Sequence, residues 1–135
     1  MFIDTSAFIA ILAGEPSGAA LANAIESAKT PLTSPLVRLE TCMRLATKLD
    51  LSPEIAQSAF DRLVEDGAIE IVPITDAMGR EAVAAFSRFG KGRGHPAQLN
   101  LADCLVYACA KARGAPVLCI GDDFARTDIP LAWKG

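Results

Sequence analysis

Five carboxylates stand out because each lies inside, or shortly after, an apolar stretch of the chain. They are Asp4, Glu40, Asp103, Asp122 and Asp123. Carboxylates are rarely buried in proteins unless they are paired or bind a metal ion. Two of them ~4 Å apart repel by about 4 kcal/mol at an effective dielectric constant of ~20. If these side chains meet in the fold, a cation must hold them together.

The ligand chemistry of such a cluster predicts its reaction. Carboxylate oxygens, joined by the oxygens of a substrate phosphate, suit Mg²⁺ or Mn²⁺. One or two ions of this kind activate water for in-line attack on a phosphodiester bond. The acidic positions therefore predict a metal-dependent enzyme that hydrolyses phosphodiesters.

Each acid also has a purely structural interpretation. Asp4 can cap the first helix, and Glu40 can pair with Arg44 one helical turn later. Asp103 suits the first turn of a helix, where the helix dipole favours a negative charge. The two adjacent acids near the end of the chain are common turn residues. One metal pocket explains all of these positions together better than separate structural roles do.

Short apolar segments alternate with amphipathic or apolar helical patterns along the chain. Strands are expected at residues 1–4, 69–74 and 117–120, with a shorter extended piece within 30–35. Helices are expected at residues 5–12, 17–28, 36–49, 53–66, 76–89 and 100–113. This alternation predicts a single α/β domain over residues 1–135, an α/β/α sandwich with a mostly parallel central sheet. Ligands of such sheets bind at the carboxyl ends of the strands, where Asp4 and the Asp122–Asp123 pair would meet.

Composition narrows the class of protein. The chain has 135 residues, 51% of them hydrophobic, and a net charge of -3, which is unlike a disordered chain or a strongly basic nucleic-acid binder. The sequence contains no membrane span, and its first residues do not resemble a secretory signal. The four cysteines form no zinc-binding pattern and are expected to be buried thiols. We therefore expect a cytoplasmic protein.

Four short segments together resemble PIN-domain ribonucleases, and more closely the VapC toxins of bacterial toxin–antitoxin systems. The segments are Asp4-Thr5-Ser6-Ala7, residues 35–40 (PLVRLE), residues 100–104 (NLADC) and residues 121–124 (GDDF). Their order and spacing carry the resemblance, which covers essentially the whole chain.

The resemblance implies a PIN-like fold and a Mg²⁺- or Mn²⁺-dependent endoribonuclease that acts on tRNA, rRNA or mRNA. It also implies a homodimer and a cognate VapB-type antitoxin, for which the apolar side of the first helix around Phe8, Ile9 and Leu12 is a candidate surface. The residues implied as catalytic and metal-binding are Asp4, Glu40, Asp103 and Asp122, with Asp123 as the alternative to Asp122. The hydroxyl of Thr5 or Ser6 is expected near the metal.

Basic side chains offer contacts for a polynucleotide. Arg88, Lys91 and Arg93 lie in or beside a glycine-rich loop, and Arg38 lies two residues before Glu40. These four residues are predicted to bind RNA phosphates, although a solvated basic loop explains them equally well. His95 is not expected to act as a general acid.

Two other classes of function fit the same residues. One is a metal-dependent nuclease or phosphatase that acts on DNA. The other is a catalytically silent binding module in which the acids are structural. Cleavage of RNA rather than DNA, and its loss in the presence of a chelator, separate these alternatives from the ribonuclease.

Overall fold

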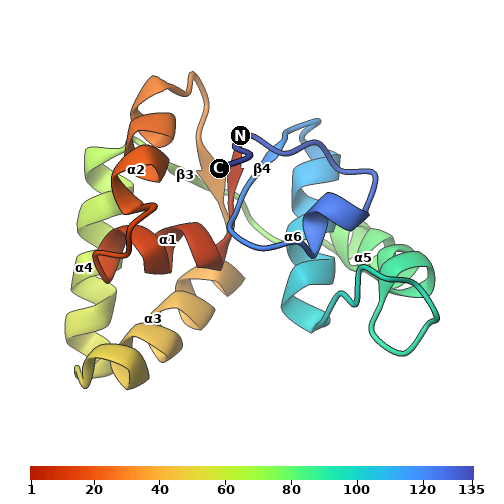
Figure 1. Ribbon diagram of the computed structural model, residues 1–135, viewed down its shortest axis with the longest axis horizontal. Helices are drawn as coiled ribbons and strands as arrows, with labels where there is room; N and C mark the ends of the chain where they lie inside the picture. Colours follow the sequence, from red (N-terminus) through yellow and green to blue (C-terminus); the bar gives the residue numbers. More distant parts are fainter.

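Helices and short strands alternate along the chain in the computed structural model, which describes residues 1–135 (Figure 1). The strands are β1 (Phe2–Ile3), β2 (Leu32–Thr33), β3 (Glu70–Ile71) and β4 (Val117–Leu118). The helices are α1 (Thr5–Leu12), α2 (Gly18–Ser27), α3 (Pro35–Leu49), α4 (Pro53–Asp66), α5 (Asp76–Phe89) and α6 (Leu101–Ala112), followed by the 3₁₀ helix η1 (Phe124–Arg126). All six predicted helices are present, with ends within two residues of the prediction.

The four strands form one sheet in the order β3-β2-β1-β4, and every pair is parallel. The sheet was expected to be mostly parallel and is entirely so. Helices α1 to α4 lie on one side of the sheet and α5 and α6 on the other, as Figure 1 shows. All strands therefore end at the same edge, and the predicted α/β/α sandwich is confirmed.

Strands β1 and β2 are short because a helix begins almost immediately after each of them. Asp4 already caps α1, and Ser34 accepts the amide hydrogen bond of Val37 as the cap of α3. The predicted strand 69–74 is reduced to two residues at the edge of the sheet, followed closely by Pro73. Proline cannot donate a hydrogen bond to a neighbouring strand, so it ends the pairing there.

The core lies on both faces of β1. Phe2 and Ile3 are completely buried, and Phe8 of α1 stacks on Phe60 of α4 with ring centroids 4.5 Å apart. Ile9 is also buried. The expectation of an antitoxin surface around Phe8, Ile9 and Leu12 is therefore wrong for Phe8 and Ile9, whose side chains fill the interior, whereas Leu12 is half-buried against the core.

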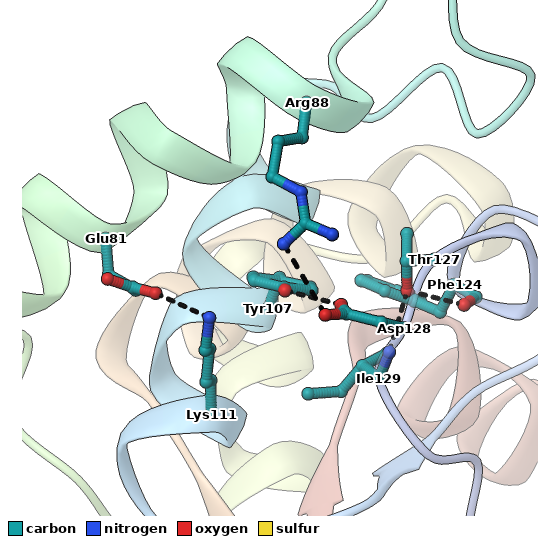
Figure 2. A network of polar contacts seen from close by, with 8 residues as sticks. All are labelled: Glu81, Arg88, Tyr107, Lys111, Phe124, Thr127, Asp128 and Ile129. Carbon is teal, nitrogen blue, oxygen red and sulfur yellow. Dashed lines mark hydrogen bonds and ion pairs between the residues drawn. The ribbon is translucent and has the colours of Figure 1, made fainter.

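A segment that the sequence analysis did not assign runs beside β4. The amide of Val117 donates to the Pro130 carbonyl at 2.9 Å, and the amide of Ala132 donates to the Val117 carbonyl at 2.8 Å. Figure 2 shows how α5 and α6 hold this segment: the Tyr107 hydroxyl donates to Asp128 Oδ1 at 2.5 Å, and Arg88 lies 3.5 Å from Oδ2. We call this pair of contacts to Asp128 the C-terminal latch.

None of the helices has both the length and the apolar character needed to cross a membrane. All four cysteines are buried and free, which confirms the sequence prediction for them.

Candidate active site

The predicted acids are brought to the carboxyl edge of the sheet by the elements that begin there. Asp4 joins β1 to α1, and Asp103 is the third residue of α6. Asp123 precedes η1 in the loop that follows β4. Glu40 lies one turn into α3. A parallel sheet places these segments together even though they are far apart in the sequence.

Asp4 is only 7% exposed. Its Oδ2 accepts hydrogen bonds from the Ser6 amide at 3.1 Å and from the Ser6 hydroxyl at 2.6 Å, so the helix cap occupies one of its two oxygens. Burial raises the pKa of Asp4, the hydrogen bonds from Ser6 oppose that rise, and the negative charge of Glu40 adds to it. The Oδ1 atom takes no part in these two hydrogen bonds.

Asp103, like Asp4, both caps a helix and lies under the influence of other acids. Its Oδ2 accepts the Asn100 amide at 3.1 Å while its own amide donates to Asn100 Oδ1 at 2.9 Å, which forms a capping box. Burial is the largest cause that raises the pKa of Asp103 to about 6, against the lowering effect of the Asn100 hydrogen bond. The charges of Asp4, Asp123 and Glu40 raise it further. The four carboxylates therefore share one electrostatic environment.

The two adjacent acids after β4 are both exposed but differ in their charged neighbours. Asp123 is among the charges that raise the pKa of Asp103. Asp122 is instead 80% exposed at its side chain and lies 3.9 Å from Arg126, one turn later. Sequence reasoning named Asp122 as the fourth acid with Asp123 as its alternative, and the structure brings Asp123 toward the cluster.

Ser6 connects two parts of the site. Besides donating to Asp4, its Oγ accepts a hydrogen bond from the Ile120 amide at 2.9 Å. The start of α1 is thereby fixed to the loop that carries Asp122 and Asp123. The neighbouring Thr5 hydroxyl is buried and has no hydrogen-bond partner. Both hydroxyls that the sequence suggested thus lie beside Asp4, one fully engaged and one free.

The thiol of Cys119 is affected by the negative charges of the site. The thiol is 4% exposed, and burial together with the charges of Asp4, Asp103 and Asp123 raises its pKa to about 12. Such a thiol remains protonated at neutral pH and is a poor nucleophile. Cys119 is therefore an uncharged, buried side chain, as the sequence predicted, and the influence of the acids on it is what the structure adds.

The basic residues predicted to bind RNA fall into two groups. Arg38 pairs with Asp61 and lies 4.9 Å from the Phe60 ring, so it joins α3 to α4. Arg88 belongs to the C-terminal latch. Lys91 and Arg93 are exposed in the loop before α6 and form no ion pair. Only the second group is free to meet a substrate without breaking an ion pair.

The acids do not close around an ion by themselves. No group of three or more His, Cys, Asp or Glu side chains has a geometry that could hold a metal ion. The donor set nevertheless fits a hard divalent cation, because it consists of carboxylate oxygens and includes a buried Thr5 hydroxyl oxygen without a partner. The alternative pairing of Glu40 with Arg44 is not formed, which leaves Glu40 available to the cluster.

Comparison with known proteins gives a consistent answer. The family model of the PIN domain matches residues 1–130. Ribonuclease VapC28 of Mycobacterium tuberculosis is 42% identical over 132 residues, which cover 98% of this chain and 97% of that protein.

Solved structures agree on the fold. The crystal structure of Mycobacterium tuberculosis VapC20, described as a toxin that cleaves the sarcin–ricin loop, is 20% identical with a TM-score of 0.75 and covers 95% of each chain. A toxin–antitoxin complex from Klebsiella pneumoniae is 18% identical with a TM-score of 0.67, over 92% of this chain and 89% of that one. The fold, the ordered acids and these similarities agree: this chain belongs to the VapC family of PIN-domain proteins.

Proposed function

We propose that this protein is the toxin of a toxin–antitoxin pair and that it hydrolyses RNA as an endoribonuclease dependent on Mg²⁺ or Mn²⁺. The observation that carries the proposal is the gathering of acids at the carboxyl edge of the sheet, where Asp4 is buried before α1 and Asp103 lies in the first turn of α6. Burial, and then the charges of Asp4, Asp123 and Glu40, raise the pKa of Asp103 to about 6, in agreement with such a cluster. Carboxylates that destabilise one another in this way are retained where they have a function. Relatives about as long as this chain are named VapC ribonucleases, which supports RNA as the substrate.

Asp4 and Asp103 would hold the cation, each through the oxygen that its helix cap leaves free, and Glu40 and Asp123 would complete the acidic pocket. A bound Mg²⁺ or Mn²⁺ supplies an activated water and stabilises charge on the scissile phosphate. Ser6 keeps Asp4 in one orientation and ties it to the loop of Asp123. No histidine takes part in this scheme. His95 instead has a structural role, because it accepts a hydrogen bond from the Ala97 amide and packs edge-on against Phe89.

Positive charge for the RNA backbone would come first from Lys91 and Arg93, which form no ion pair. Arg38 and Arg88 would contribute less, because each already neutralises an aspartate. The net charge of -3 means that binding depends on such local contacts and on the metal rather than on an overall positive field.

The partners proposed are a VapB-type antitoxin and a second copy of the chain. The neighbour from Klebsiella pneumoniae is a toxin–antitoxin complex, which supports the first. An apolar cavity of about 490 Å³ between α5 and α6 supports the second, with Val83 69% exposed and Leu101 75% exposed at its rim. Exposed apolar side chains gathered in this way are typical of an interaction surface.

Activity on matched substrates tests the proposal against its alternatives. Purified protein is incubated with RNA and with DNA of the same sequence, in excess Mn²⁺ or in EDTA. We expect cleavage of RNA only, and only with metal. Cleavage of DNA favours the nuclease alternative, and absence of any hydrolysis favours a binding module.

Expression in cells gives a second test of the same site. Production of the protein without an antitoxin should arrest growth, and Asp103→Asn should relieve the arrest because asparagine keeps the size of the side chain but loses its charge. A soluble Asp103→Asn protein that remains fully toxic contradicts the assignment of the acids.

A further inference from the structure

A cavity of about 700 Å³ opens beside the acidic cluster, between the loop after β4 and the end of the chain. Ile120 lies in its wall, and the Ile120 amide donates to the Ser6 hydroxyl, which in turn donates to Asp4. The cavity is therefore adjacent to the start of α1, where Asp4 lies. None of the residues assigned above to metal or phosphate binding accounts for its other lining residues, which include Leu131, Trp133 and Lys134.

Trp133 is the single tryptophan of the chain. It lines the cavity, and it also packs against the hydrophobic core, so that the indole is partly buried. Gly135 lies against the six-membered ring, where a Cβ would come within 2.7 Å of the ring edge. The ring is thus held from the core side and along one edge while it still lines an open cavity.

The charges around this cavity suit a nucleotide. Lys134 is exposed, forms no ion pair and lies next to the indole. The one acid in the lining, Asp122, has Arg126 beside it at 3.9 Å. A phosphate near Lys134 would therefore meet one free cation and an acid whose charge is partly balanced.

The wall opposite the β4 loop is firmly attached. Ile129, Pro130 and Leu131 line the cavity, and they directly follow Asp128 of the C-terminal latch. Figure 2 shows the Tyr107 hydroxyl and the Arg88 guanidinium converging on Asp128 from α6 and α5. The hydrogen bond from Val117 to Pro130 adds a link to the sheet. The amide of Ala132, which donates to the Val117 carbonyl, extends these links to the residue before Trp133.

We propose that this cavity binds a nucleobase of the RNA next to the scissile phosphate, with Trp133 as its stacking platform and Lys134 as a contact to the adjoining phosphate. This inference rests on the proposed function and names a subsite of the same active site. Bases of any identity stack on an indole, and one cation nearby anchors the backbone. The subsite would thus add affinity for single-stranded or unstacked RNA with little selection among bases.

Fluorescence of Trp133 tests the subsite without any need for catalysis. The wild-type protein is titrated in EDTA with a short single-stranded oligoribonucleotide, and N-acetyltryptophanamide serves as the control for absorption and collision effects. We expect saturable quenching of the protein and none of the control. Absence of quenching at RNA concentrations that saturate cleavage in Mn²⁺ overturns the proposal.

Kinetics of matched variants give the second test. Trp133→Ala should raise KM for RNA roughly tenfold, the loss of one base stack, and leave kcat within about twofold. Trp133→Phe keeps an aromatic ring and should stay close to wild type. Lys134→Ala should reduce the slope of log affinity against log salt concentration by about one, the effect of one lost phosphate contact. If Trp133→Ala fails to fold, Trp133→Phe, Lys134→Ala and the fluorescence titration of the wild type still test the subsite.

The two proposals fail in different ways. Wild-type protein that cleaves no RNA contradicts the proposed function, whereas quenching by RNA in EDTA would still support the subsite. Active wild-type protein whose KM is unchanged in Trp133→Ala overturns the subsite alone. Loss of antitoxin binding in Trp133→Ala with unchanged KM for RNA also overturns it, because the cavity then belongs to a protein partner.

Discussion

The Ser6 hydroxyl accepts a hydrogen bond from the Ile120 amide at 2.9 Å, which joins the first helix to the loop after the last strand. The same oxygen donates to Asp4 at 2.6 Å. One small side chain therefore sets the position of a buried acid relative to the loop that carries Asp123.

Ser6→Ala should weaken metal binding and RNA cleavage more than it weakens the fold. Loss of the hydroxyl removes two hydrogen bonds, each worth about 1 kcal/mol to stability. Misplacement of a catalytic group by ~1 Å costs on the order of a hundredfold in rate, so cleavage should fall by more than stability alone explains. Ser6→Thr, which keeps the hydroxyl, should recover much of the activity. The exposed Ser87→Ala is the control, and equal losses in Ser6→Ala and Ser87→Ala would contradict the positioning role.

Asp103→Asn should raise the melting temperature in EDTA at about pH 7.5. The folded pKa of Asp103, about 6, lies above the ~3.9 of an unfolded aspartate, so the folded state binds the proton more tightly. The ionised carboxylate therefore costs stability that is fully present above about pH 6 and disappears below about pH 4. Asparagine removes this cost and still offers an oxygen to the Asn100 amide.

The pH series itself is the check. The stability gain of Asp103→Asn over wild type should shrink as the pH falls from about 7.5 to about 4. Asp66→Asn, at an exposed position near the end of α4, should show no such trend. A variant that is less stable than wild type at every pH would mean that the capping role of Asp103 outweighs repulsion within the cluster.

Excess Mn²⁺ should stabilise the wild-type protein by mass action. The gain is about 2.7 kcal/mol at a metal concentration a hundred times the dissociation constant. Asp4→Asn and Asp103→Asn should lose most of this gain, although asparagine at position 4 remains a good helix cap. Melting curves in EDTA and in Mn²⁺ measure the effect. Equal shifts in all three proteins would indicate metal binding elsewhere.

The adjacent pair after β4 offers a matched comparison. Asp123→Asn should lower RNA cleavage by about tenfold or more, because its charge belongs to the cluster around Asp103. Asp122→Asn changes the same kind of side chain one position earlier, where it lines the cavity beside Trp133 and pairs with exposed Arg126, and should stay within about threefold. Initial rates at saturating Mn²⁺ distinguish the two. A larger loss of rate in Asp122→Asn than in Asp123→Asn would indicate that Asp122 is the fourth acid of the site.

Tyr107→Phe should loosen the C-terminal segment. The variant loses the hydrogen bond to Asp128, at a cost of about 1 kcal/mol. The Tyr107 hydroxyl and the charge of Arg88 lower the pKa of Asp128, so this contribution is present above about pH 4 and is lost as the pH falls through the folded pKa. Urea denaturation at neutral and acidic pH measures it. A loss of stability that is the same at both pH values would contradict a role for the ionised carboxylate.

Much of the fold follows from local signals in the sequence. Ser52 before Pro53 predicts the start of α4, and the apolar spacing within α3 and α6 predicts their buried sides. Strand content was less predictable. The segment richest in β-branched residues, 69–74, contributes only the two-residue edge strand β3, because Pro73 and an exposed edge limit its pairing. Propensity describes the local chain, whereas strand length depends on partners that are distant in sequence.

The candidate site was likewise predictable only in part. Asp4, Glu40 and Asp103 were recognisable from the sequence because a carboxylate in apolar surroundings is costly unless it is paired or binds a metal ion. The choice between Asp122 and Asp123 was not predictable, because both residues are exposed in the same turn and only the folded structure shows which charges each one meets. Asp128 was missed because it lies in a polar stretch that reads as an ordinary loop. Tyr107 in an apolar helix was the available signal, since a buried tyrosine hydroxyl needs a partner.

The strand order β3-β2-β1-β4 has a consequence for synthesis of the protein. The first strand to leave the ribosome occupies an inner position, and its neighbour β4 is the last to be made. Asp4 is therefore translated well before Asp123 and meets it only after the segments between them have emerged. Because β1 cannot pair on its outer side before then, a nascent chain carries an incomplete set of acids. Translation and the onset of nuclease activity are thus separated in time by the topology of the sheet.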